Sequence, residues 1–364
     1  MWPGAGRERI HHMFITGLGT ATPPKRYTQS ECWDALVASG YLSRLNLRSR
    51  AILRKVLQGT NGICSRFLAL EDLTEALAMS PDELDERFAK HAPTVAAQAG
   101  ARALSNAGIA AGDVDAVIIS TCTGYLCPGL TSYVSERLGL RRDVLALDLV
   151  GQGCGAALPN LRTGDAFLAS GRARTVLSIC VEICSAAFYL DDDPGVLISA
   201  CLFGDGAGAA VLSDTPGTHT RRIEWKTAGT LLSTRDREAL RFERRLGMLR
   251  NILTPDVPAI AGKHVATVFN DVLSGAGIAR EAITAWILHA GGREILAEIQ
   301  QQLGITEHDT RWSADTLREY GNVSSACVYF VLQAALRAEA PGGLWWLSSF
   351  GAGFSCHGAL LHVA

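Results

Sequence analysis

The sequence lacks an excess of basic residues, a long apolar run and the spacing motifs of a metal site. Lysine and arginine together number 34 against 36 aspartate and glutamate residues, a formal net charge of −2. Binding of nucleic acid or of an anionic membrane needs a concentrated basic excess, so the overall charge favours neither partner. No apolar run reaches the roughly 18 residues that span a bilayer, and no apolar signal core follows the polar start. We therefore expect a cytoplasmic protein.

The ten cysteines do not form a metal-binding pattern. The nearest pairs, Cys122 with Cys127 and Cys180 with Cys184, are not CxxC and have no histidine cluster beside them, so structural zinc is not expected. Disulfide frameworks are typical of short secreted proteins, whereas this chain has 364 residues. We expect free thiols. The acidic run at 191–193, which precedes a proline, is typical of a solvated turn rather than of a metal site.

The pattern of apolar residues indicates the fold class α/β. Continuous apolar runs separated by helical stretches are typical of a sheet that is covered on both faces. A helix is expected over 72–110, where Ser80 provides an N-cap and Pro81 the first helical position. The arginine-rich segment 214–250 is expected to hold surface hairpins and the boundary between two halves. The expected strands are 14–18, 116–120, 144–149, 175–182, 207–212, 285–288, 344–348 and 358–363.

Two stretches of the chain are similar to each other. Phe-Gly-Asp-Gly at 203–206 and Phe-Gly-Ala-Gly at 350–353 each precede an expected strand of small and apolar residues. An internal duplication would produce this similarity, and so could chance.

Cys154 is a candidate nucleophile. It lies in the sequence Gly-Gln-Gly-Cys-Gly, after an expected strand and at the expected start of a helix. Unpaired backbone N–H groups and the positive end of the helix dipole favour a thiolate there, so we expect a pKa below the usual value of about 8.5. A cysteine in an apolar sequence is more often a buried structural thiol. The strand, glycine and helix setting favours the functional role for Cys154 alone.

His289 and Asn322 are candidate partners of Cys154. His289 ends an expected strand, and ligands bind at the carboxyl ends of strands in α/β sheets. Asn322 lies in a glycine turn that opens into a helix of small residues. Taken singly, the histidine is typical of a structural hydrogen-bonding residue and the asparagine of a helix cap. Together the three predict a thiolate paired with an imidazolium, beside an amide that stabilises an oxyanion on an acyl or thioester carbonyl.

The order Cys, His, Asn is shared by two chemistries, papain-like hydrolysis and decarboxylative condensation. The papain-like signature, a cysteine near the start of the mature chain followed by tryptophan or tyrosine, is absent around Cys154.

Motifs along nearly the whole chain identify a family. They are Gly-Leu-Gly-Thr-Ala-Thr-Pro-Pro at 17–24, the glycine-rich turn of Cys154, Leu-Phe-Gly-Asp-Gly at 202–206, Asp-Val-Pro at 256–258, His-Ala-Gly-Gly at 289–292 and Tyr-Gly-Asn-Val-Ser-Ser-Ala at 320–326. From residue 13 to the end, these motifs resemble, in family order, the type III polyketide synthases of the chalcone and stilbene synthase family.

The resemblance implies a thiolase fold with two similar layered α-β-α halves, 13–220 and 221–364, after a flexible extension at 1–12. It implies an acyltransferase in which Cys154 takes a starter acyl group from a thioester, and malonyl-CoA then extends it by decarboxylative condensation. His289 and Asn322 would bind the thioester carbonyl. The expected partners are malonyl-CoA, acyl-CoA or an acyl carrier protein, and a second copy in a homodimer. No metal, nicotinamide or flavin is implied.

The resemblance also assigns residues to the substrate cavity. Phe203 matches an aromatic gatekeeper between the tunnel and the cavity, with core packing as its alternative role. Asn251 matches a second gatekeeper, where plant members carry phenylalanine. Because most wall residues are small, an aliphatic starter is favoured over a planar aromatic one. The other expected wall residues are Cys122, Thr123, Cys127, Cys184, Ala187 and Ser324.

One departure from the family pattern implies a weak grip on the coenzyme A phosphates. The segment 59–67 matches a region where plant members place several basic residues against the coenzyme A phosphates. Here only Arg66 is basic, with Arg54 and Lys55 upstream. An acyl carrier protein is therefore an alternative carrier of the starter. Ala352 stands where proline is common in the family, so the floor of the cyclisation pocket is expected to differ.

We interpret the sequence as a type III polyketide synthase that condenses an aliphatic or fatty acyl thioester with malonyl units and releases a pyrone, a resorcinol or a related ring. The alternatives are a single-condensation ketosynthase, a thiol hydrolase and a catalytically silent binding homologue. Incorporation of more than one malonyl unit separates the first two.

Overall fold

The computed structural model describes residues 11–77, 79–218 and 221–364, and its core is a nine-stranded sheet. The order of the strands is β11-β12-β13-β8-β1-β7-β6-β4-β5. Their bounds are β1 (Met13–Ala21), β4 (Ala116–Thr121), β5 (Leu145–Val150), β6 (Thr175–Glu182), β7 (Gly206–Ser213), β8 (Ile223–Leu232), β11 (Ile283–Leu288), β12 (Gly343–Gly351) and β13 (Ser355–Val363). Two further pairs are β2 (Arg26–Thr28) with β3 (Ser65–Phe67), and β9 (Leu240–Arg245) with β10 (Met248–Leu253).

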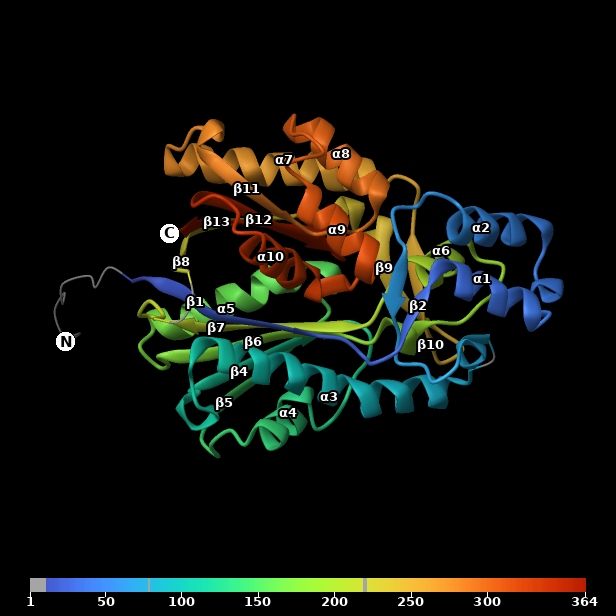
Figure 1. Ribbon diagram of the computed structural model, residues 1–364, viewed down its shortest axis with the longest axis horizontal. Coiled ribbons are helices and arrows are strands. Elements are labelled where there is room, and N and C mark those ends of the chain that lie inside the picture. Colours follow the sequence, from blue (N-terminus) through green and yellow to red (C-terminus); the bar gives the residue numbers. More distant parts are fainter. Residues whose placement is uncertain (1–10, 78, 219–220) are drawn as a thin grey trace.

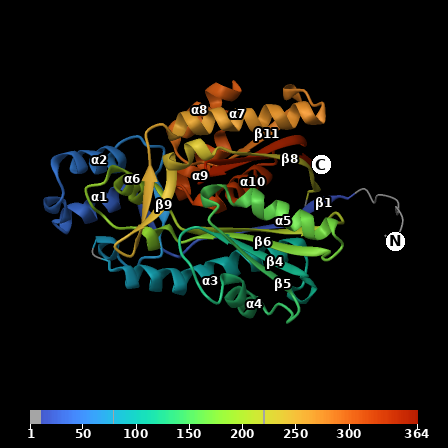
Figure 2. The ribbon, with the colours of Figure 1, turned by 180° about the vertical axis from the view of Figure 1, so that it is seen from behind.

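The strands of this sheet form two groups, β5-β4-β6-β7-β1 and β8-β13-β12-β11. Helices cover both faces of each group and fill the space between the groups (Figure 1). Helices α5 and α10 form the middle layer, which is seen from behind in Figure 2. Helices α3 and α4 lie outside one group of strands, and α7 and α8 lie outside the other. The bounds are α1 (Gln29–Ala38), α2 (Leu47–Gln58), α3 (Pro81–Ala107), α4 (Leu130–Leu138), α5 (Ala157–Ala169), α6 (Pro194–Leu202), α7 (Val257–Ala276), α8 (Arg293–Leu303), α9 (Arg311–Tyr320) and α10 (Cys327–Arg337).

The same strand pattern occurs twice. Strand β1 is antiparallel to β7, β7 is antiparallel to β6, and β6 is parallel to β4. Likewise β8 is antiparallel to β13, β13 is antiparallel to β12, and β12 is parallel to β11. The two similar glycine stretches of the sequence precede β7 and β13, which are equivalent strands. The division into halves at 13–220 and 221–364 stays a prediction.

The α/β class and most expected strands are confirmed, but the helix expected over 72–110 is wrong at its start. A short 3-10 helix covers Leu73–Leu77, and α3 begins only at Pro81. The Ser80 hydroxyl accepts from the Glu83 N–H while the Glu83 carboxylate accepts from the Ser80 N–H. This reciprocal capping box starts a new helix.

Two other expectations need correction. The segment 214–250 holds a hairpin, β9 with β10, but it also contains β8, a long strand of the central sheet. Its sequence, Ile-Glu-Trp-Lys-Thr-Ala-Gly-Thr-Leu-Leu, has no continuous apolar run before its last two residues, so an apolar-run criterion misses this strand. The strand expected at 144–149 forms as β5 but is not buried, because it lies at the edge of the sheet and exposes Leu145 and Val150.

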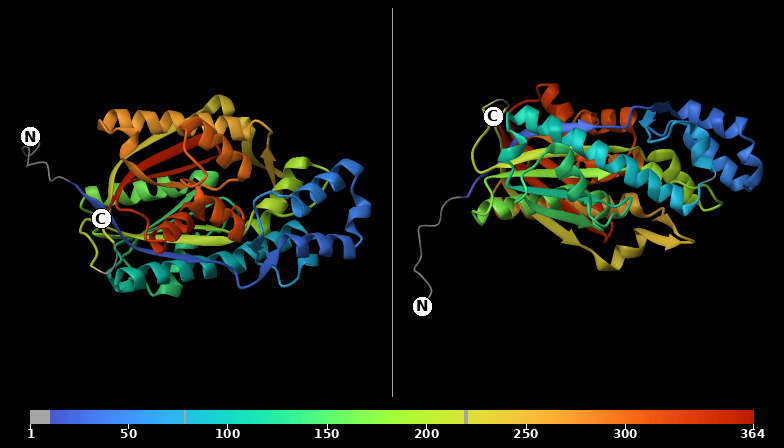
Figure 3. Two further views of the ribbon diagram at one scale, coloured as in Figure 1. Left: turned by 45° about the horizontal axis from the view of Figure 1, so that its top comes forward. Right: turned by 90° about the horizontal axis from the view of Figure 1, so that it is seen from below.

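A smaller group of elements projects from one end of the molecule, away from the C-terminus. It contains α1, α2 and α6, with the β9-β10 hairpin beside them (Figure 3). Its apolar residues form a cluster of their own, centred on Leu36, Leu53, Leu57 and Leu197.

None of the described helices is both long and apolar enough to cross a membrane. Of the predicted extension at 1–12, residues 1–10 lie outside the described residues. The imidazoles of His11 and His12 lie 2.6 Å from Asp165 and 2.9 Å from Glu224.

Candidate active site

Cys154 lies in a tight turn between β5 and α5. A short 3-10 helix at Gly153–Gly155 contains it, and α5 begins two residues later. Gly153 has a φ of 56°, and a Cβ built on it would come within 2.8 Å of the Ala352 nitrogen. A Cβ on Gly351 would lie 2.4 Å from the Gly155 nitrogen. Backbone therefore packs on backbone here, and glycine is required at these positions.

The Cys154 thiol has one polar side-chain contact among the described residues. The Ser324 hydroxyl donates to the Cys154 Sγ at 3.2 Å. Burial raises the pKa of Cys154 to about 12, and the Ser324 hydrogen bond opposes this rise. The expected lowering of this pKa is therefore wrong for the substrate-free site, because desolvation outweighs the dipole of a helix that starts three residues later.

Asn322 is held by backbone and in turn holds the loops around it. Its N–H donates to the Leu202 carbonyl, and its carbonyl accepts from the Gly204 N–H. The carboxamide Nδ2 donates to the Gly291 carbonyl at 3.0 Å, and Oδ1 accepts from the Ser324 N–H at 2.9 Å. The amide thus fixes both the loop after His289 and the residue that contacts Cys154.

His289 is buried at the end of β11. Its backbone N–H donates to the Ser348 carbonyl, and its imidazole ring packs edge-on against the Phe350 ring with a centroid distance of 5.0 Å. Within the described chain its Nδ1 has no hydrogen-bond partner. Burial lowers the pKa of His289 to about 4. The expected imidazolium is therefore wrong for this state, since the ring is neutral near pH 7.

The three predicted residues converge on one place. Cys154 contacts Ser324, Ser324 is bonded to Asn322, and Asn322 is bonded to Gly291, two residues after His289. A second set of contacts connects His289 to the turn of Cys154. Phe350 packs on the His289 ring, and the next residue, Gly351, packs on the turn. The turn of Cys154 thus shares one site with segments more than 130 residues further along the sequence.

Sequence reasoning missed a buried carboxylate behind this site. Glu182 ends β6 and is fully buried. Its carboxylate accepts from the hydroxyls of Thr123 and Ser325 and from the Cys122 N–H, at 2.9, 2.5 and 3.0 Å. Burial raises the pKa of Glu182. An acidic residue inside the apolar run 175–182 was the available signal, since buried carboxylates are rare without partners.

The residues expected around the substrate divide into three groups. Cys122, Thr123 and Ser324 gather around Glu182. Cys184 and Phe203 pack in one apolar cluster with Leu68, Leu70 and Phe188.

The remaining three are placed differently. Ala187 is half-buried in the short 3-10 helix at Cys184–Ala187. Asn251 is buried, and its Nδ2 donates to the Ser199 hydroxyl of α6 at 2.7 Å. Cys127 is exposed, and no contact within the described chain brings it to the site.

The three basic residues expected at coenzyme A differ in exposure. Arg66 is 2% exposed, and its guanidinium donates to the carbonyls of Ala200 and Phe203 and to the Gln29 side chain. These contacts occupy it in the core, so the expected contact with coenzyme A is inconsistent with its position. Arg54 and Lys55 are exposed on α2.

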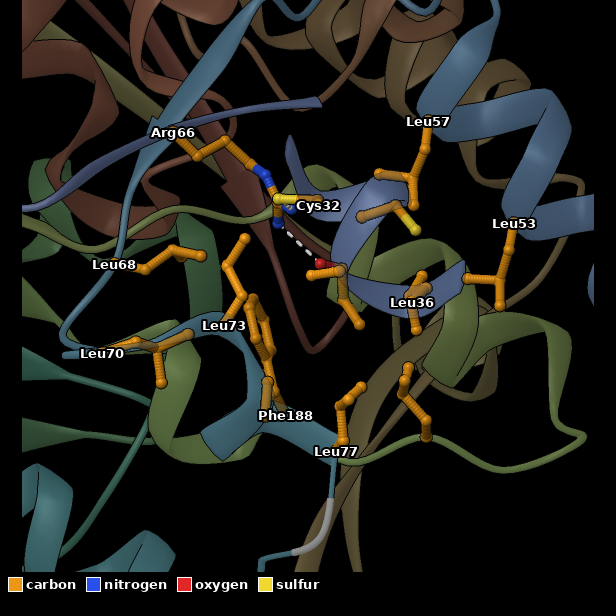
Figure 4. A pocket seen from close by; sticks show the side chains of 15 residues that line it. Cys32, Leu36, Leu53, Leu57, Arg66, Leu68, Leu70, Leu73, Leu77 and Phe188 are labelled. Atoms are coloured by element: carbon orange, nitrogen blue, oxygen red, sulfur yellow. Dashed lines mark hydrogen bonds between the residues drawn. The ribbon is translucent and has the colours of Figure 1, made fainter. Parts of the chain in front are cut away.

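An apolar pocket adjoins the cluster that contains Cys184 (Figure 4). Its cavity volume is about 50 Å³, several times the roughly 10–15 Å³ that admits one water molecule. Arg66 forms its only charged wall, and the guanidinium is already hydrogen-bonded. The lining comes from α1, α2, α6 and the loops before α3 and α6, including Leu36, Leu53, Leu57, Leu73, Leu77, Phe188 and Ala200.

Comparisons with known proteins agree over most of the chain. Residues 38–235 match the family described as FAE1/Type III polyketide synthase-like protein, and residues 239–363 match the C-terminal domain of chalcone and stilbene synthases. The 3,5-dihydroxyphenylacetyl-CoA synthase of Streptomyces toyocaensis is 30% identical over 95% of this chain and 89% of its own. That of Amycolatopsis balhimycina is also 30% identical, over 95% of this chain and 92% of its own.

Solved structures show the same thiolase-like fold. PKS-I from the brown alga Ectocarpus siliculosus superposes with a TM-score of 0.87 at 26% identity, over 99% of this chain and all of that chain. The C-terminal type III polyketide synthase domain of Steely1 from Dictyostelium gives a TM-score of 0.85 at 25% identity, over 97% and 99% of the two chains. The expected fold is confirmed.

Proposed function

Because the chain belongs to the type III polyketide synthases of the chalcone and stilbene synthase family, acyltransferases that use malonyl-CoA, we propose that Cys154, His289 and Asn322 carry its reaction. The observation that carries this proposal is their convergence through Ser324, Gly291 and Phe350.

In the first step, Cys154 takes the starter. Its sulfur forms a bond to the acyl carbon, the bond from that carbon to the carrier sulfur breaks, and the thiol proton passes to the leaving sulfur. Near pH 7 the proton rests on the sulfur, because burial holds the pKa of the Cys154 thiol at about 12 and that of His289 at about 4. Neutral His289 accepts this proton while the Cys154 sulfur attacks, and the resulting imidazolium then donates it to the leaving carrier sulfur.

In the second step, His289 and Asn322 bind the malonyl thioester carbonyl. The Asn322 amide has two N–H groups and uses one on Gly291, which leaves the other for the substrate oxygen. Loss of carbon dioxide leaves an enolate on that oxygen, and the two N–H donors stabilise it. The enolate carbon then attacks the acyl carbon on Cys154, and the sulfur leaves as a thiolate that takes up a proton from solvent to restore the thiol.

We propose an aliphatic starter. The apolar pocket adjoins Cys184 and Phe203 through a shared cluster and has no uncompensated charge, which suits an alkyl chain. We propose that the extended chain leaves as a pyrone or a resorcinol-type ring.

We also propose a homodimer with β5 at its interface. An edge strand presents unpaired backbone groups, and β5 adds the exposed side chains of Leu145 and Val150. A second copy of the chain that pairs along β5 would cover both.

The test is product formation from dodecanoyl-CoA and malonyl-CoA, followed by mass spectrometry. We expect products with two or more malonyl-derived units from the parent and from Cys64→Ala, an exposed cysteine outside the site. Cys154→Ala should release no such product. Free dodecanoic acid without carbon dioxide would instead indicate a hydrolase, one malonyl unit a single-condensation ketosynthase, and no reaction a silent homologue.

A further inference from the structure

A polar cleft opens beside β1, apart from the catalytic residues. Strand β1 runs between α3 and α10, and both helices contact it (Figure 1). At the carboxyl end of β1, these helices and the end of α9 line a cleft with a cavity volume of about 440 Å³. Pockets of about 300–1,000 Å³ are typical of sites for small molecules.

This cleft is distinct from the sites described above. Among the described residues, none that lines it forms a hydrogen bond with Cys154, His289 or Glu182. Its lining also excludes Arg54 and Lys55, the exposed basic residues that the resemblance assigns to coenzyme A. The cleft therefore needs an explanation of its own.

The charged residues of the cleft are all basic. Arg102 of α3 and Arg337, the last residue of α10, line it, and no carboxylate of the described chain does so. Both arginines are exposed, and neither forms an ion pair with another described residue. The Arg102 guanidinium uses one N–H group on the Thr20 carbonyl, which leaves its other N–H groups for a ligand. Two unpaired guanidinium groups attract an anion.

The neutral amides of the cleft also present donors. Asn106 Oδ1 accepts from the Leu18 N–H at 2.9 Å. Because a backbone N–H can only donate, this contact fixes the amide with its NH2 group turned away from Leu18. Gln333 Oε1 likewise accepts from the Thr20 hydroxyl at 2.8 Å, which leaves the NH2 group of Gln333 for a ligand. Both amides thus use their oxygen on the protein and keep their donors, and hydrogen bonds from such donors to an anion are strong.

One wall of the cleft is aromatic. The Phe67 ring stacks on the Tyr320 ring with a centroid distance of 5.6 Å, and the Tyr320 ring packs against the Phe330 ring at 4.8 Å. All three residues line the cleft. Phe67 and Tyr320 are half-buried, so this wall can still take a flat ring.

We infer that the cleft binds a small aromatic anion, a flat ring that bears a carboxylate or a phosphate. The anionic group meets Arg102, Arg337 and the NH2 group of Gln333, where a planar guanidinium donates two parallel N–H bonds to a carboxylate or a phosphate. The ring lies on Phe67 and Tyr320. A neutral ligand would leave the arginine charges without a partner, and an aliphatic anion would not use the aromatic wall. This binding site is additional to the proposed reaction and does not depend on it.

The experiment measures binding to the full chain by isothermal titration calorimetry. The probe is 4-hydroxybenzoate, and phenyl phosphate is a second arm that distinguishes a phosphate ligand from a carboxylate ligand. We expect one site per chain, with a Kd of about 1 mM or below for at least one of the two anions. The neutral analogue 4-hydroxybenzyl alcohol should bind at least about tenfold more weakly than 4-hydroxybenzoate. Cyclohexanecarboxylate, which has the charge without the aromatic ring, should bind at least about threefold more weakly.

Two variants test the residues of the cleft. Gln333→Glu keeps an oxygen for the Thr20 hydroxyl but replaces the NH2 donor by a negative charge, so it should weaken anion binding by about tenfold or more. Arg337→Gln removes an exposed cation and should weaken binding by about fivefold. The matched controls are Gln301→Glu on α8 and Arg172→Gln after α5, two exposed positions outside the cleft. Both controls should bind the anions as the parent does.

Unchanged affinity in both Gln333→Glu and Arg337→Gln would overturn the inference, because the probe would then bind elsewhere on the chain. So would equal affinity for the neutral alcohol, or the lack of binding of either anion at about 10 mM. Equal affinity for cyclohexanecarboxylate would overturn the aromatic class of the ligand. A thermal unfolding midpoint equal to that of the parent separates loss of the site from loss of the fold. The assay does not use polyketide formation, so its failure would leave the proposed function intact.

Discussion

The hydrogen bond from Ser324 to Cys154 is the one polar side-chain contact that opposes the rise of the thiol pKa among the described residues. Replacement of Ser324 by alanine removes it. Because the hydroxyl donates to sulfur at 3.2 Å, it stabilises the thiolate more than the thiol, and its loss must raise the pKa further.

The size of the change follows from the strength of the bond. A hydrogen bond to a charged group contributes about 1.5–3 kcal/mol, and each pKa unit corresponds to about 1.4 kcal/mol. The pKa of Cys154 should therefore rise by about one to two units. The thiolate fraction then falls by about ten- to a hundredfold, but each thiolate becomes more nucleophilic, with a Brønsted coefficient of about 0.45. The net loss of alkylation rate is about four- to thirteenfold at any pH below the pKa.

The assay is the rate of iodoacetamide modification of Cys154, followed by mass spectrometry from about pH 6 to about pH 10. Ser325→Ala is the matched control, because its hydroxyl donates to Glu182 and makes no contact with the sulfur. If the pH–rate profile of Ser324→Ala superimposes on that of the parent, the 3.2 Å hydrogen bond from Ser324 does not lower the pKa of the Cys154 thiol.

Three further changes test other parts of the structure. Ala200→Phe should fill the apolar pocket and lower kcat/KM for dodecanoyl-CoA by about tenfold relative to butanoyl-CoA; equal losses for both would show that the pocket does not hold the chain. Arg66→Met should lower the free energy of unfolding in urea by about 3 kcal/mol, because two buried carbonyls lose their donor, whereas the exposed Arg54→Met should change it little. Burial raises the pKa of Asp205 to about 6, so the folded state binds more protons than the unfolded state between the ordinary value of about 4 and that value. The stability of the parent relative to Asp205→Asn should therefore fall by about 3 kcal/mol as pH rises through this window and stay level above it; a difference independent of pH would contradict the raised pKa.

Local sequence patterns predicted most strands of the sheet and singled out the three candidate residues, because each of these signals depends on neighbours in the chain. The strand before Cys154, the glycines around it and the glycine turn before Asn322 are all readable locally. The capping box at Ser80 was also readable, and it should have divided the helix expected over 72–110. The prediction placed the start of this helix too early, because the apolar pattern continues across the break between Leu77 and Pro81.

Electrostatics could not be predicted in the same way. Whether Cys154 and His289 are charged depends on desolvation by residues far away in the sequence, and that outweighed the nearby helix end. The burial of Arg66 could not be predicted from the sequence either. Its carbonyl partners Ala200 and Phe203 lie more than 130 residues away, so only the folded chain shows that a basic residue near the expected entrance is part of the core.

The continuous sheet restricts how this protein can adapt to substrates of different length. Met13–Ile15 of β1 pair with Ile223–Trp225 of β8, so backbone hydrogen bonds join the two repeated groups of strands. A hinge between them would have to break those bonds. We therefore expect bulkier intermediates to be accommodated by individual side chains rather than by separation of the two groups of strands, and substitutions of single side chains are the changes to test for an effect on product length.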